Sequence, residues 1–214
     1  MEYKLNNALL RYFKYVHTLY DEWLIINRTI ETSLKIVDDQ NEILRLISDD
    51  VTYNDIEIDE EQRQRLMFKI LIVLDNELNS LFRIMSQFNY TIQDLMNHYD
   101  NVIQYRSRIY LADKEMIPLI MGSYCRPRLS LLMEWTTKSL EYFRKLYFCI
   151  NNEIHNYNKE NIADKVRAAI NQINNRTSIK NILAYTQYMM KEEFLQPKHK
   201  NTGVQKIISN NIIE

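Results

Sequence analysis

Residues 67–102 read MFKILIVLDNELNSLFRIMSQFNYTIQDLMNHYDNV, and apolar side chains recur along them in alternating steps of four and three. Such steps keep one stripe of an α-helix against a neighbouring helix, here over about five heptads. The stretch therefore predicts a helix much longer than a typical globular helix, lying alongside other helices. The members of this seam are Met67, Leu71, Leu74, Leu78, Leu81, Met85, Phe88, Ile92, Leu95, Tyr99 and Val102.

Glycine and proline are scarce in this chain of 214 residues. There are two glycines and three prolines, and residues 1–117 contain neither type. Turns and the connections between strands depend heavily on both residues. Their scarcity predicts few, long helices and argues against an all-β or Rossmann-type fold.

Three long helices are expected, at about 3–48, 59–111 and 128–155. Asp59 followed three residues later by Gln62 predicts a capping box at the start of the second helix. The acidic run before it, residues 49–61, interrupts the helical periodicity and predicts a solvated loop, or alternatively a docking strip for a basic partner.

The second helix is apolar well beyond its seam. A wide apolar face needs neighbours on more than one side, which favours a bundle over an isolated dimeric rod. The expected fold is therefore all-α: an elongated antiparallel bundle of three long helices with coiled-coil-like packing. The flanking apolar residues are Phe68, Ile70, Ile72, Val73, Phe82 and Ile84.

The chain changes character after residue 158, the expected end of the long-helix bundle. Two shorter helices are expected at about 161–174 and 178–195, followed by a tail at 196–214. The tail is interpreted either as a disordered end or as a segment that orders on a partner. Its apolar residues, which favour the second interpretation, are Val204, Ile207, Ile208, Ile212 and Ile213.

The overall charge argues against several classes of protein. The net charge of −1 predicts no direct binding to nucleic acid or to an anionic membrane surface. No apolar run is long enough to span a bilayer, and the amino terminus does not resemble a signal peptide. The two cysteines fit a reducing compartment. We expect a protein of the nucleus, the cytoplasm or both.

No catalytic or ligand-binding motif emerges from the chain. The four histidines are scattered, without the spacing of metal ligands, and neither glycine belongs to a phosphate-binding loop. Cys125 lies beside Arg126, but no base accompanies it in a recognisable pattern. The sequence therefore predicts no enzyme activity, no metal and no cofactor.

One stretch resembles a known family. It contains Arg126-Pro127-Arg128, Met133-Glu134-Trp135, Ser139-Leu140-Glu141-Tyr142-Phe143-Arg144-Lys145 and Asn152-Glu153-Ile154. This stretch, with Trp23-Leu24-Ile25-Ile26-Asn27 and the long helix that follows, resembles the cyclin-dependent kinase 2-interacting protein family over about residues 10–155. Pro127-Arg128-Leu129 stands where that family has Trp-Pro-Thr.

The resemblance implies a small helical adaptor linked to checkpoint signalling and to an AAA ATPase assembly that acts on ribosomal precursors and replication machinery. It marks Tyr142, Phe143, Arg144 and Lys145 as a candidate contact element. The alternative for these four residues is an ordinary amphipathic turn, with Phe143 in the core and Arg144 and Lys145 solvated. Further candidate partner contacts are Pro127, Ile207, Ile208 and Ile212.

Two other functional classes remain open at this point. The first is a coiled-coil subunit of a kinetochore or vesicle-tethering complex, which predicts the same helices. The second is a membrane-curving homodimer of three long helices, which requires a basic concave face and is disfavoured by the nearly neutral charge. All the favoured interpretations have other helical proteins as partners.

Overall fold

The computed structural model describes residues 2–48, 59–110, 114–123, 126–157, 161–176 and 179–195. These residues form helices and connecting turns without any strand, so the predicted all-α fold is confirmed. The helices are α1 (Glu2–Ser48), α2 (Glu60–Ser107), α3 (Ile117–Met121), α4 (Leu129–His155), α5 (Ile162–Arg176) and α6 (Ile179–Leu195), with a 3-10 turn at Lys114–Met116 before α3.

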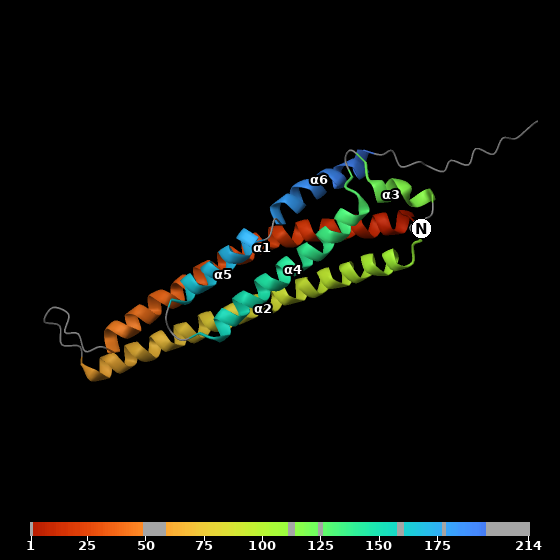
Figure 1. The fold of residues 1–214 in the computed structure, drawn as a ribbon. Coiled ribbons are helices and arrows are strands. Elements are labelled where there is room, and N and C mark those ends of the chain that lie inside the picture. The colour runs from red at the N-terminus through yellow and green to blue at the C-terminus, as the bar shows by residue number, and fades with distance from the viewer. Residues whose placement is uncertain are drawn as a thin grey trace, which may run out of the picture.

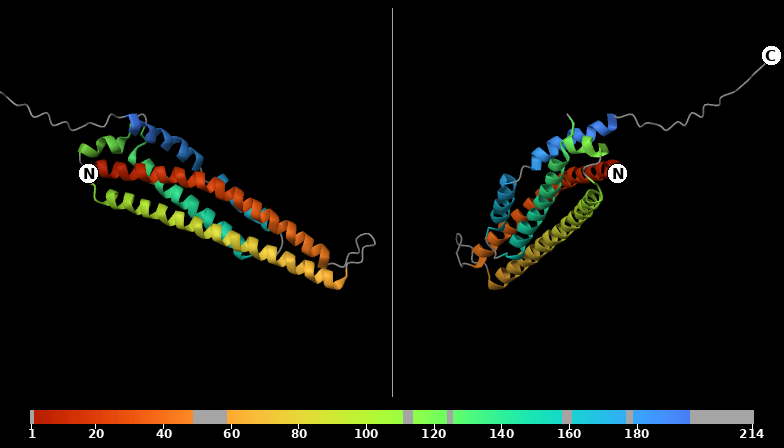
Figure 2. Two further views of the ribbon diagram at one scale, coloured as in Figure 1. Left: turned by 180° about the vertical axis from the view of Figure 1, so that it is seen from behind. Right: turned by 45° about the vertical axis from the view of Figure 1, so that its right-hand side comes forward.

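The helices build a long rod (Figure 1). α1 and α2 run antiparallel along its full length, and α4 lies against both of them. α5 and α6 follow one another back along α1 and α4, so that α6 ends near α3 and the amino terminus (Figures 1 and 2). The two shorter helices therefore contribute to the same core as the long ones.

Aromatic contacts fix the alignment of α1 and α2. Trp23 of α1 stacks on Phe88 of α2 with ring centroids 5.1 Å apart, and Tyr12 meets Tyr99 edge to face at 6.4 Å. Residue numbers rise along one helix as they fall along the other, as an antiparallel pair requires. The seam predicted along residues 67–102 is largely buried here, from Leu74 to Val102.

Helix α4 binds the α1–α2 pair through a buried tyrosine. The hydroxyl of Tyr12 donates to the backbone carbonyl of Thr136 at 2.7 Å and lies 2.9 Å from Oγ of Ser139. The small side chains of Thr136 and Ser139 are themselves fully buried, which lets the helices approach closely at this level. A buried polar group must be hydrogen-bonded to avoid a desolvation cost, and this tyrosine is.

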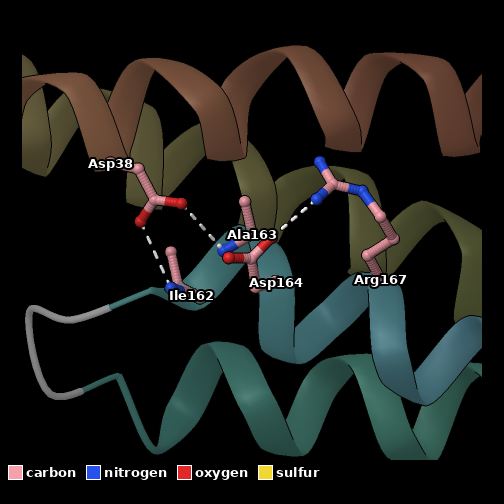
Figure 3. Close-up of polar contacts among 5 residues, drawn as sticks. All are labelled: Asp38, Ile162, Ala163, Asp164 and Arg167. Atoms are coloured by element: carbon pink, nitrogen blue, oxygen red, sulfur yellow. Dashed lines mark hydrogen bonds and ion pairs between the residues drawn. The ribbon is translucent and has the colours of Figure 1, made fainter.

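Helix α5 begins at a carboxylate that belongs to α1. Asp38 accepts hydrogen bonds from the backbone N–H groups of Ile162 at 3.2 Å and Ala163 at 3.1 Å (Figure 3). The first N–H groups of a helix have no partner inside the helix, and a carboxylate there also complements the positive end of the helix dipole. Asp38 thus caps α5 from another helix.

Two local expectations differ from the structure. Asp59 does occupy the N-cap position of α2, but its side chain makes no capping hydrogen bond, so the predicted capping box is wrong. The predicted helices at 59–111 and 128–155 leave the residues between them outside any helix, yet part of this segment forms α3. Pro118 in its first turn and Gly122 directly after its end are the usual signals for a helix start and stop.

Candidate functional site

The candidate contact element in α4 divides between the core and the surface. Tyr142 and Phe143 are buried, and their rings meet edge to face at 5.1 Å. The Tyr142 hydroxyl donates to Oδ1 of Asn174 in α5 at 2.8 Å, and burial raises the pKa of this phenol well above its ordinary value. These two residues hold α4 to its neighbours, and the expectation that they contact a partner is corrected.

Arg144 and Lys145 remain on the surface, as the amphipathic alternative predicts. Nζ of Lys145 donates to the carboxylate of Glu141 at 3.2 Å, one turn earlier. The guanidinium of Arg144 makes no hydrogen bond or ion pair to any of the residues that the structure describes. One cation of this turn is therefore paired within the helix, and the other is available to a partner.

A groove between α2 and α4 lies beside this turn. It has a volume of about 520 Å³ and is lined by two stripes, Asn89, Ile92, Gln93 and Met96 on α2 and Glu141, Arg144, Lys145, Tyr147 and Phe148 on α4. Residues at spacings of three, four and seven lie along one face of a helix. Two such faces side by side form a channel about two helical turns long, the shape that accepts a third helix.

The groove combines an apolar floor with polar borders. Ile92 is buried at its base and Met96 is half-buried, while Phe148 is 63% exposed at its edge. Most of this aromatic ring is therefore accessible to a partner that occupies the groove. Phe148 was not among the residues that the sequence marked, although its place four residues after Arg144 was visible in the sequence.

Pro127 lies in the tight segment that leads into α4. Gly122 has a φ of 77°, and a Cβ at this position would lie 2.7 Å from the Arg126 carbonyl oxygen and 2.8 Å from the Arg128 nitrogen. The guanidinium of Arg126 also donates to the Pro118 carbonyl at 2.8 Å. Pro127 is half-buried in this arrangement. The other candidates, Ile207, Ile208 and Ile212, lie outside the described residues.

The far end of the α1–α2 hairpin carries a second exposed apolar surface. The sequence predicts that the residues flanking the seam pack inside the bundle, and for several of them this is wrong. Of the six flanking residues, Ile70 is buried and Ile84 is half-buried, and the other four are exposed. The ring of Phe82 meets His155 at the end of α4, at 4.9 Å, so the residues of α2 before it lie beyond α4. The exposed apolar residues of α2 here are Leu66, Phe68, Leu71, Ile72, Val73 and Phe82.

Within the described ranges, no three His, Cys, Asp or Glu side chains are placed to share a metal ion. Cys149 is a half-buried free thiol in α4. The described helices also include none that is long and apolar enough to cross a membrane.

No protein-family model matches the chain, and no curated protein matches it significantly. The resemblance described above therefore rests on the residues quoted for it.

Proposed function

We propose that this protein is a non-catalytic helical adaptor or scaffold subunit of a multiprotein complex, and that it holds a helix of another protein in the groove between α2 and α4. The observation that carries the proposal is the pair of matched stripes, each spaced as one helical face, with Phe148 exposed at the edge. Helix-in-groove recognition uses anchors with this spacing.

The chemistry of the groove defines the partner segment. Ile92 and Met96 line the groove and accept apolar side chains, and Phe148 adds an exposed aromatic ring to the same lining. The guanidinium of Arg144, which pairs with none of the described residues, favours a carboxylate on the partner, because an arginine binds a carboxylate through two parallel hydrogen bonds. The expected ligand is an amphipathic helix with two or more apolar anchors and an Asp or Glu beside them.

The resemblance to the cyclin-dependent kinase 2-interacting protein family supports an adaptor in the nucleus or cytoplasm that associates with an AAA ATPase assembly. Under this proposal, the part of the resembling element that meets the partner is Arg144, while Tyr142 and Phe143 fix α4 in place. The alternative, a coiled-coil subunit of a kinetochore or vesicle-tethering complex, uses the same helices and differs in the partner.

An affinity purification from native lysate tests the proposal. The tagged full chain is compared with Phe148→Glu and with Tyr188→Glu, a control on α6 whose side chain is exposed to nearly the same extent (65%) but lies away from the groove. We expect a partner whose recovery falls about tenfold with Phe148→Glu, since buried aromatic anchors carry much of the binding energy of an interface. Tyr188→Glu is expected to recover the same partner in the same amount as the wild type.

The outcome also separates the two functional classes. Recovery of an AAA ATPase with the wild type supports the adaptor, whereas recovery of kinetochore or vesicle-tethering proteins supports the alternative. Equal recovery of every protein by the wild type and by Phe148→Glu would contradict binding in the groove.

A further inference from the structure

A second stripe of evenly spaced residues runs along the exposed side of α2. Glu61, Arg65, Phe68, Ile72, Asp75, Asn79 and Phe82 follow one another in steps of four and three. All seven are exposed, and each from Phe68 onward directly follows a residue of the largely buried seam, so the stripe lies about 100° around the helix from that seam. Phe68 is 64% exposed and Ile72 is 45% exposed. This spacing allows two helices to pack along one another as a coiled coil.

The stripe lies on the part of the rod that the shorter helices do not cover. α4 has 27 residues and α2 has 48, so α4 is about 30 Å shorter at 1.5 Å per residue. At this end of the molecule, α1 and α2 continue as a two-helix hairpin beyond α4 and α5 (Figures 1 and 2). A helix that is apolar on several sides, as α2 is from Leu66 to Leu74, is expected to be covered on more than one of them.

The order of residues along the stripe is self-complementary. In a two-fold contact between antiparallel copies of α2 centred at position 70, residue i lies opposite the residue numbered 140 minus i. Phe68 then meets Ile72 of the second copy, Arg65 meets Asp75, and Glu61 meets Asn79. Apolar side chains pair at the centre, opposite charges pair on both sides of them, and an amide faces a carboxylate beyond. Each pairing occurs twice because the contact is symmetric.

We propose that α2 binds α2 of a second copy of this chain in this antiparallel register, through residues 61–79. In the isolated chain, Arg65 pairs with Glu61 and Asp75 accepts a hydrogen bond from Asn79 at 3.1 Å, so each charge has a partner on its own helix. In the dimer, Arg65 and Asp75 each gain a neighbour of opposite charge, which comes from the other copy. A seam of this length gives a dimer that forms reversibly and depends on concentration. This surface is separate from the α2–α4 groove, so the proposal holds or fails independently of the proposed function.

Charge reversal tests the register on the full chain. Light scattering and sedimentation over a concentration series give the dissociation constant of the wild type, of Arg65→Asp, of Asp75→Arg and of the variant carrying both changes. Each single reversal places like charges opposite one another twice and is expected to raise the dissociation constant about tenfold. The double reversal restores both attractive pairs and is expected to return the constant to within about threefold of the wild type.

Two further variants complete the experiment. Phe68→Glu is expected to abolish the dimer, because it buries two carboxylates at the centre of the contact. Lys138→Glu, on an exposed ion pair of α4, changes a surface charge near the level of Tyr99 rather than residues 61–79 of α2, and is expected to leave the dimer unchanged. Circular dichroism on each variant verifies that the helices are retained, and only variants that retain them are interpreted.

The proposal is overturned by three results. A wild-type chain that stays monomeric across the series excludes a second copy as the occupant of this surface and leaves it to another protein or another segment of the chain. If Phe68→Glu leaves the dissociation constant of the dimer unchanged, the two copies bind through another surface. A dimer weakened by both single reversals and not restored by the double reversal contradicts the antiparallel register.

Discussion

The carboxylate of Asp38, near the end of α1, accepts a hydrogen bond from the backbone N–H of Ile162 at 3.2 Å and so caps a helix that begins 124 residues later (Figure 3). The second carboxylate oxygen binds the N–H of Ala163 at 3.1 Å. This contact fixes the point at which the chain turns from α4 into α5 and returns along α1.

Replacing Asp38 by alanine is expected to destabilise the protein. The change leaves two N–H groups at the start of α5 without a side-chain acceptor, and losing such a cap costs about 1–2 kcal/mol. The free energy of unfolding, measured with urea, is the readout. Asp39→Ala is the matched control, since Asp39 is exposed on the neighbouring position of α1. Equal stability of the two variants would show that the cap contributes nothing.

Gly122→Ala is expected to destabilise the entry into α4. A φ of 77° is costly for alanine, and the added Cβ would lie 2.7 Å from a backbone oxygen and 2.8 Å from a backbone nitrogen. A loss of at least about 1 kcal/mol is expected, because backbone atoms must shift to relieve the contact. Urea unfolding measures it, with Met121→Ala as the control at the adjacent, exposed residue. A Gly122→Ala protein as stable as that control would contradict the described turn.

Stability is expected to fall as the solution becomes acidic, in part because of His17. Burial between α1 and α6 lowers the pKa of His17 below 6.5, partly offset by the nearby Asp21 carboxylate. Nε2 lies 2.9 Å from the Thr186 hydroxyl, which itself donates to the Ile182 carbonyl. The folded state therefore binds a proton less readily than the unfolded state, and stability is lost as pH falls through about 6.5 toward the lower folded-state pKa.

The contribution of His17 is isolated with His17→Gln, which does not titrate in this range. Unfolding midpoints of the two proteins are compared at pH 7.5 and at successively lower pH. We expect the midpoint of the wild type to fall more steeply below about pH 6.5 than that of the variant. Parallel pH profiles, or a steeper fall for the variant, would be inconsistent with the burial of a neutral imidazole.

The helices themselves could be predicted from the sequence because their apolar periodicity is long and regular. The second long helix was expected at 59–111 and runs from Glu60 to Ser107. The third was expected at 128–155 and is α4, which runs from Leu129 to His155. Boundaries at this accuracy follow from where the seam loses its apolar character and from the scarcity of Gly and Pro. The contact between Asp38 and α5 could not be foreseen, since it joins segments with no local relationship.

The surfaces were harder to predict than the helices. Periodicity shows which side of a helix is apolar but does not show how far a neighbouring helix reaches along it. Phe68 and Ile72 were expected inside the bundle, yet α4 ends near the level of Phe82 and leaves them exposed. Tyr142 was expected to meet a partner, yet α4 is covered by α5 on that side, where Asn174 binds its hydroxyl. Both differences arise from the number of helices that surround each point of the rod.

The central claim, that the groove between α2 and α4 receives a helix of another protein, is tested most directly by photo-crosslinking. A benzophenone amino acid replaces Phe148 in one full-length protein and Tyr188 in another, and both are irradiated in native lysate. The account predicts crosslinks from position 148 to a helical segment of a second protein, weakened by Arg144→Glu and absent from position 188. No crosslinked protein at position 148, or the same products from both positions, would contradict it.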